Sequence, residues 1–159
     1  MRYALVYGLI TGLVIMGVIL GGSLLAPNAA IFSTVWFGYT VMVVAMTFLF
    51  VGVKRYRDVE KGGVIRFLPA LGIGLAIGLV AVVTYVLIWE IYLAATHYAF
   101  IDLYFSGTDP ETVAMRETYS NPVYRAFYTA LELAPVALIM ALFAAALLRN
   151  PRLLPAKTP

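Results

Sequence analysis

The sequence predicts an all-α integral membrane protein: an up-down four-helix bundle with both termini in the cytoplasm and a short external helical segment between the third and fourth spans. Composition, long uncharged segments and the distribution of Lys and Arg lead to this prediction. Of the 159 residues, 63% are hydrophobic and 12% are charged, and the mean hydropathy is +0.94. A soluble fold of this size lacks the polar surface to cover so apolar a chain. The composition therefore excludes a secreted domain, a nucleic-acid-binding protein and a cytosolic enzyme.

Four segments are long enough to cross a hydrocarbon layer, which takes about 20 residues of helix. No residue from Tyr3 to Val53 is charged, and Ala26-Pro27-Asn28 divides this run into two spans. The third segment is uncharged over residues 67–89, and the fourth contains one charge, Glu132. Within a single membrane domain, residues 1–159, the predicted spans are 3–25, 31–53, 67–96 and 126–148, and the external segment is 97–125.

A cleaved signal peptide is an alternative interpretation of the first span. However, its apolar run is about twice the usual 7–15-residue core, and no small-x-small cleavage site follows it. We therefore favour an uncleaved span.

The basic residues predict the orientation of these spans. Nine of the eleven Lys and Arg residues fall on one predicted side: Arg2, Lys54, Arg55, Arg57, Lys61, Arg66, Arg149, Arg152 and Lys157. The other side has only Arg116 and Arg125, among acidic residues. Because cytoplasmic loops are enriched in Lys and Arg, both termini should lie in the cytoplasm.

Small residues predict where the helices touch, since helices in lipid associate by close packing. Candidate contacts are Gly8/Gly12 and Gly17/Gly21 on the first span, Gly74/Gly78 on the third and Ala126/Ala130/Ala134 on the fourth. We favour contacts within one protomer, and a homo-oligomer remains open.

Two capping signals organise the external segment. Asp109-Pro110 should begin a short surface helix that ends at Tyr119, and Asn121-Pro122 should begin the helix that becomes the fourth span. Pro135, inside that span, should kink it and free the carbonyl of Leu131.

Ionisable residues inside spans are costly, so they indicate functional sites. Helical spacing places Glu90 and His97 on one face of the third span, and a matching stripe on the fourth consists of Arg125, Tyr128, Thr129 and Glu132. One interpretation is a helix-docking pair between Arg125 and Glu132, with Glu90 reaching interfacial water. The alternatives are a proton-titrating or ligand-binding pocket, and a divalent-metal site formed by Glu90, His97 and Glu132.

The run from Lys54 to Gly63 is the other charged feature. Its simpler interpretation is anchoring at the cytoplasmic face, with Gly62-Gly63 ending a helix and Asp58 paired with a neighbouring cation. The functional interpretation is an anionic-lipid headgroup site formed by Lys54, Arg55, Arg57 and Lys61. No catalytic or cofactor motif occurs and there is no cysteine, so we expect no catalytic residue, cofactor or metal and favour a non-enzymatic protein.

Two stretches of the chain, with residues between them, carry a family resemblance. The first runs from Gly38-Tyr39 through Phe50–Asp58 to Gly62-Gly63 and Phe67. The second is Tyr119–Pro122 followed by Thr129, Glu132, Pro135 and Val136. Between them lie Tyr85, Trp89, Asp102 and Tyr104. Together these residues resemble the bacterial domain-of-unknown-function family 4199, which implies a four-helix bacterial membrane protein and supplies no activity.

Two hypotheses of function remain. The first is a non-enzymatic structural or accessory protein of the bacterial inner membrane, with a lipid, anionic lipid included, or a small ligand bound between its helices. The second is a small oligomeric proton-coupled transporter or channel that uses Glu90 or Glu132.

Overall fold

The computed structural model describes residues 1–25 and 34–156. In these residues all regular structure is helical: α1 (Arg2–Leu25), α2 (Val35–Ala45), α3 (Thr47–Glu60), α4 (Phe67–Ala95), α5 (Ala99–Tyr104), α6 (Pro110–Ser120) and α7 (Pro122–Leu148). The predicted break at Ala26-Pro27-Asn28 and the predicted beginning of the second span at residue 31 lie outside the described residues, as does Lys157.

Within the described residues, four helical segments are long and apolar enough to cross a membrane: Arg2–Gly22, Val35–Glu60, Phe67–Ala95 and Pro122–Leu148. The chain is therefore a multi-pass membrane protein by length and composition. The second segment comprises α2 and α3, which are separated at Met46. It extends beyond the predicted end at Val53, because the helix continues through the basic run and ends at Glu60. The two glycines after it adopt positive φ angles, as expected for residues that end a helix.

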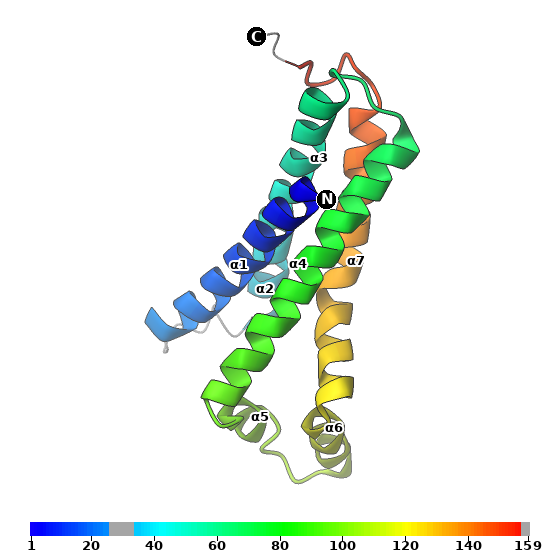
Figure 1. Ribbon diagram of the computed structural model, residues 1–159. Coiled ribbons are helices and arrows are strands. Elements are labelled where there is room, and N and C mark those ends of the chain that lie inside the picture. Colours follow the sequence, from blue (N-terminus) through cyan, green and yellow to red (C-terminus); the bar gives the residue numbers. More distant parts are fainter. Residues whose placement is uncertain (26–33, 157–159) are drawn as a thin grey trace.

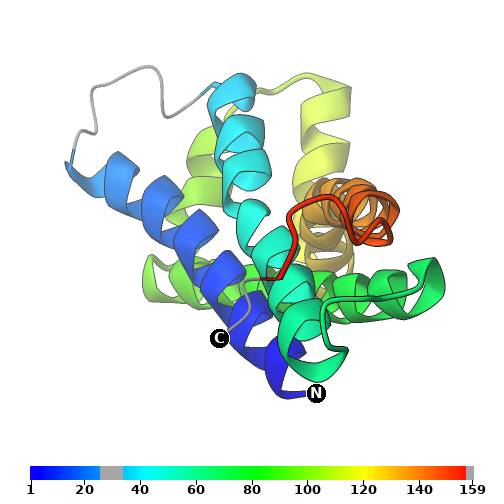
Figure 2. The ribbon, with the colours of Figure 1, turned by 90° about the horizontal axis from the view of Figure 1, so that it is seen from above.

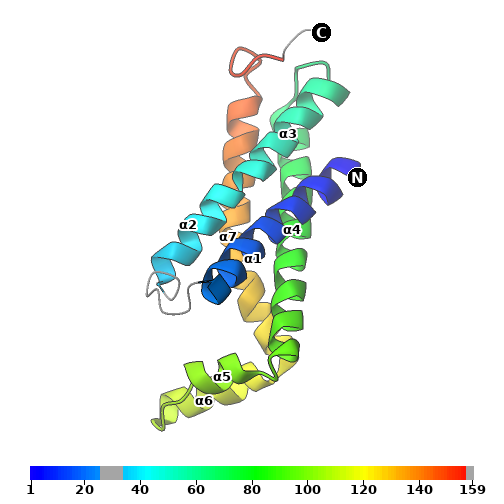
Figure 3. The same cartoon turned by 90° about the vertical axis from the view of Figure 1, so that its left-hand side faces the viewer.

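The longest helix, α4, is the centre of the arrangement and packs against α1, α3 and α7. Figures 1 and 2 show that α3 runs alongside α1 and α7 across one side of α4. The end of α3, the beginning of α4 and the end of α7 lie at one end of the molecule, which we call the basic end (Figure 1). At the opposite end, α5 and α6 project sideways from α4 and α7 (Figure 3).

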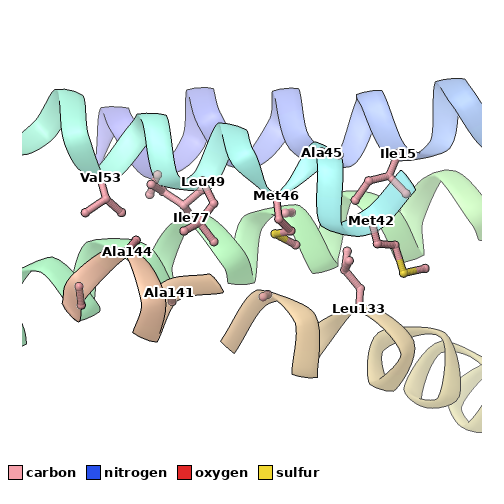
Figure 4. Packing of buried hydrophobic residues seen from close by; sticks show 14 of the residues in the cluster. Ile15, Met42, Ala45, Met46, Leu49, Val53, Ile77, Leu133, Ala141 and Ala144 are labelled. Atoms are coloured by element: carbon pink, nitrogen blue, oxygen red, sulfur yellow. The ribbon is translucent and has the colours of Figure 1, made fainter. Parts of the chain in front are cut away.

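Aliphatic and methionine side chains fill the space between these helices (Figure 4). On α2, α3 and the Met46 junction, Met42, Ala45, Met46, Leu49 and Val53 are at most 5% exposed. They belong to one cluster with Ile15 of α1, Ile77 of α4, and Leu133, Ala141 and Ala144 of α7. The core thus joins all four apolar segments.

Two glycines of α1 allow it to approach α4 closely. A Cβ atom built on Gly8 would lie 2.5 Å from Val80 Cβ, and one on Gly12 would lie 2.6 Å from Thr84 Cβ. These positions confirm the predicted contact at Gly8/Gly12. Gly17 and Gly21 differ, because a Cβ atom there would meet nothing within 4 Å.

The contact between α4 and α7 also uses small residues on both helices. Cβ atoms built on Gly74 and Gly78 would lie 3.1 Å from the Cβ atoms of Ala141 and Ala137, respectively. The glycine prediction for α4 is therefore confirmed. On the last span the buried alanines are Ala137, Ala141, Ala144 and Ala145, whereas the predicted Ala126, Ala130 and Ala134 are only partly buried. The contact lies nearer the basic end, where α7 faces the glycines of α4.

Side-chain caps begin α6 and α7 as predicted. Asp109 accepts a hydrogen bond from the backbone N–H of Thr112 at 2.9 Å, and Asn121 accepts one from the N–H of Val123 at 2.9 Å. Each helix has proline in its first turn. The helix α7 runs continuously through Pro135, and its axis changes direction between its two ends (Figure 3), as an internal proline favours.

We expect Gly8→Ala to lower the free energy of unfolding by about 1–3 kcal/mol, because the added methyl group overpacks the contact with α4. The matched control is Gly17→Ala on the same helix, where the methyl group meets open space. That change should leave stability unchanged or raise it by less than about 1 kcal/mol through helix propensity. Thermal unfolding of the detergent-solubilised protein measures both. Equal changes in the stability of the two variants would contradict close packing of α1 on α4.

Candidate functional site

An ion pair joins the end of α4 to the beginning of α7. Arg125 donates from Nε to Glu90 Oε1 at 2.8 Å and from Nη2 to Glu90 Oε2 at 2.6 Å. Its Nη1 donates to the carbonyl oxygen of Tyr119 at 2.9 Å, and the side chain of Arg125 is only 3% exposed. The guanidinium also lies over the ring of Tyr98, with Cζ 5.1 Å from the ring centre. We call these four residues the Arg125 clamp.

The end of α4 explains why Tyr98 reaches Arg125. The N–H of His97 donates to the Ala94 carbonyl at 3.2 Å, and the N–H of Tyr98 donates to the Leu93 carbonyl at 2.8 Å. This pair of bonds forms a Schellman motif, which normally has glycine at the position that His97 occupies. His97 (φ 50°) and Tyr98 (φ 59°) both adopt left-handed backbone angles. The exposed His97 is thus a turn residue.

The predicted pair between Arg125 and Glu132 is wrong, because Arg125 binds Glu90. Residues seven apart share a helix face but are separated by about 10 Å along the axis, so an arginine that turns across to α4 does not reach Glu132. Glu132 instead accepts a hydrogen bond at Oε2 from the hydroxyl of Tyr85 at 3.0 Å. Among the residues that the structure describes, no cation forms an ion pair with Glu132.

A pocket of about 220 Å³ opens beside this carboxyl group. We call it the Glu132 pocket, and its walls come from four helices: Ile19 of α1; Val35, Gly38, Tyr39 and Met42 of α2; Tyr85 of α4; and Glu132 of α7. Its lining is mostly apolar, with a carboxyl and two phenols as the polar side chains. Glu132 is exposed, so its unused acceptor positions are accessible from the pocket. Such a site suits a ligand with an apolar body and a hydrogen-bond donor.

The sequence did not place Tyr85 in the site, nor Tyr98 and Tyr119 of the Arg125 clamp. A tyrosine within an apolar span needs a partner for its hydroxyl group, and Tyr85 is 6% exposed. That requirement was the signal in the sequence.

Tyr128 and Thr129, the remaining residues of the predicted stripe on the fourth span, differ in their surroundings. Thr129 is buried, whereas Tyr128 is 44% exposed and stacks on Tyr119 with ring centres 6.0 Å apart. The structure therefore divides the predicted cluster into the Arg125 clamp and the Glu132 pocket. In the described part of the chain, no three His, Cys, Asp or Glu residues are grouped to hold a metal ion, so the alternative of a metal site at Glu90, His97 and Glu132 finds no support.

The segment around α5 and α6 contains one exposed ion pair and two groups with shifted pKa values. Arg116 of α6 pairs with Asp102 of α5, and both side chains are largely exposed. Hydrogen bonds from the hydroxyl and backbone N–H of Thr112 lower the pKa of Asp109, whose charge is favourable at the beginning of α6. Burial raises the pKa of Tyr119, and the negative charge of Glu132 raises it further. The phenol of Tyr119 therefore stays neutral beside the clamp.

At the basic end, Arg57 connects α3 to the chain after α7. The side chain is 0% exposed, and its Nε donates to Asp58 Oδ1 at 2.7 Å. Nη1 donates to the carbonyl of Leu153 at 3.1 Å, and Nη2 donates to the carbonyl of Leu154. Arg57 therefore fixes the C-terminal turn onto α3, and we leave it out of the proposed lipid-headgroup site.

The other basic residues of this run differ in their contacts. Lys54 pairs with Asp58 at 2.5 Å, as one of the sequence interpretations expected. Lys61 lies over the ring of Tyr56, 5.8 Å from its centre. Arg55 is exposed and lines a cleft against α1.

We expect Arg125→Gln to lower the free energy of unfolding by about 3 kcal/mol, because it leaves Glu90 without its cation. Arg125→Lys should restore little of the lost stability, since lysine lacks the planar fork that binds both carboxylate oxygens. The control is Arg116→Gln, which removes an exposed pair and should have a much smaller effect. Thermal unfolding in detergent compares the three variants, and full rescue by lysine would contradict a role for the bidentate geometry.

We expect His97→Gly to raise the free energy of unfolding by about 1 kcal/mol, since glycine adopts the left-handed conformation without steric cost. Thr96→Gly is the neighbouring control: Thr96 has an ordinary negative φ angle, so glycine there should destabilise the protein. Denaturant unfolding measures both changes. A less stable His97→Gly protein would show that the imidazole makes a stabilising contact.

Comparison with known proteins supplies a family and no activity. A family model described as "Protein of unknown function (DUF4199)" matches residues 2–150. That range includes the Arg125 clamp, the Glu132 pocket and the basic run of α3. No curated protein and no solved structure matches the chain. As the resemblance in the sequence implied, the chain belongs to the DUF4199 family.

Proposed function

We propose that this chain is a non-enzymatic accessory protein of the bacterial inner membrane that binds a small amphipathic ligand in the Glu132 pocket. The observation that carries the proposal is the carboxyl group of Glu132, which lies within an apolar helix and beside a pocket, with Tyr85 as its hydrogen-bond partner. A carboxyl group in such surroundings is costly, which supports a binding role for Glu132.

The proposed topology is a four-helix bundle with both termini in the cytoplasm. Its support is the gathering of basic residues at the end where α3 ends and α4 begins. Cytoplasmic loops carry such an excess of Lys and Arg. In this orientation, α5 and α6 lie on the outer side, and the Glu132 pocket lies toward the outer leaflet.

The lining of the pocket defines the class of ligand. Isoleucine, valine and methionine side chains suit a hydrocarbon or ring system, and the carboxyl group of Glu132 accepts hydrogen bonds or balances a cation. We therefore propose a lipid-soluble molecule with an amine or hydroxyl head. Its volume must fit a pocket of about 220 Å³, which is smaller than a phospholipid and suits a head group with a short apolar body.

Native mass spectrometry of protein extracted from its own membranes tests this proposal. Wild-type protein should carry a small-molecule adduct that Glu132→Gln loses and that Tyr85→Phe weakens. Glu117→Gln, which removes an exposed carboxyl group from α6, is the matched control and should keep the adduct. An adduct that survives Glu132→Gln, or wild-type protein without one, would contradict the proposal. The same spectra give the number of protomers and so test the homo-oligomer.

The alternative function, a proton-coupled transporter or channel, depends on the same carboxyl group. Glu90 is engaged by Arg125, whereas Glu132 has no cation partner among the described residues. Proton flux into proteoliposomes separates the two functions. Flux that is abolished by Glu132→Gln and retained by Glu117→Gln would favour the transporter over the accessory protein.

A further inference from the structure

A cleft of about 350 Å³ lies between α1 and α3 at the basic end. We call it the α1–α3 cleft. Its charged and polar lining consists of Arg2, Tyr3 and Tyr7 from α1, with Arg55 and Glu60 from α3. Val6 and Val59 provide apolar surface beside them. The cleft thus combines two guanidinium groups with an apolar wall at the end of two membrane-spanning segments.

The charges of the cleft are not balanced. The hydroxyl of Tyr3 donates to Glu60 Oε1 at 3.2 Å, and the ring of Tyr3 packs edge-on against Tyr56, with ring centres 5.6 Å apart. These contacts hold α1 and α3 together at the cleft. One carboxylate faces two arginines, and within the described part of the chain neither Arg2 nor Arg55 forms an ion pair.

The neighbouring cations contrast with this pair. Arg57 is buried and engaged by Asp58 and two backbone carbonyls, and Lys54 is also paired with Asp58. Arg2 and Arg55 are both exposed. The basic charge that remains available on α1 and α3 is therefore concentrated at the cleft.

We infer that the α1–α3 cleft binds the phosphate of an anionic phospholipid headgroup through Arg2 and Arg55. Guanidinium groups match phosphate oxygens with two parallel hydrogen bonds. In a membrane-facing cleft the acyl chains of the lipid also contribute to the binding free energy, because they pack against the apolar surface of Val6 and Val59. This site differs from the run Lys54, Arg55, Arg57 and Lys61 expected from the sequence, because α1 supplies one of its two arginines. It is independent of any ligand in the Glu132 pocket.

Lipid retention by the full-length protein tests the inference. Wild-type protein is reconstituted in phosphatidylcholine bilayers containing one-fifth phosphatidylglycerol, extracted gently and measured for bound lipid by native mass spectrometry. Arg2→Gln/Arg55→Gln should retain about tenfold less phosphatidylglycerol. The matched control, Arg66→Gln/Arg149→Gln, removes the same charge from the same end outside the cleft and should retain wild-type amounts.

Three results would overturn the inference. Equal loss in both double variants would show diffuse attraction by charge. Equal retention of phosphatidylcholine and phosphatidylglycerol by wild-type protein would show a lack of headgroup selectivity. Displacement of the lipid by millimolar inorganic phosphate would identify a soluble anion as the ligand. If Arg2→Gln/Arg55→Gln fails to fold, Arg2→Lys/Arg55→Lys replaces it. This variant keeps the charge and should bind less phosphatidylglycerol than wild-type protein. Wild-type binding of phosphatidylglycerol by this variant would overturn the role of the guanidinium forks.

Discussion

The close approach of α4 to its neighbours is the constraint on which the rest of the structure depends. Within lipid, helices gain little from burying apolar surface, so contact between backbones must supply the attraction. Gly8 and Gly12 of α1 leave room for Val80 and Thr84, and Gly74 and Gly78 of α4 lie against alanines of α7. These contacts fix α4 between α1 and α7. Because α4 also carries Tyr85 and Glu90, the same packing sets the position of both polar sites toward the α5–α6 end.

The two acidic residues of these sites have different surroundings because α4 and α7 present different partners along their length. At the end of α4, Glu90 accepts two hydrogen bonds from Arg125, whose remaining nitrogen Nη1 donates to the backbone carbonyl of Tyr119. About two turns further along α7, Glu132 meets the hydroxyl of Tyr85. There α2 contributes Val35, Gly38, Tyr39 and Met42 to the wall of the Glu132 pocket. The charges of the Arg125 clamp are thus paired within the protein, whereas the carboxyl group of Glu132 lines a pocket.

Local signals in the sequence were sufficient for the beginnings of α6 and α7, but they predicted neither the short helix α5 nor the pairing of charges. Asp109 and Asn121 cap α6 and α7 through hydrogen bonds within three residues, so their sequence neighbours contained the information. The partner of Arg125 depends on how far α7 is shifted along α4, and a face shared at seven-residue spacing does not specify that distance. The burial of Arg57 was not predictable, because its acceptors include the backbone carbonyls of Leu153 and Leu154, which any residue provides.

One physical rule separates the charges that the fold explains from those that the two proposals assign to ligands. A buried charge is stable only when it is paired and hydrogen-bonded, and Arg57 and Arg125 meet that requirement with acceptors from the protein itself. Each is therefore explained by the fold. Glu132, Arg2 and Arg55 are exposed and have no ion-pair partner in the described part of the chain. Each lines a cavity that also has apolar walls. Lipid head groups and amphipathic molecules in a membrane can pair with such charges and also contact apolar walls, which is the physical basis of the two ligand sites proposed for this chain.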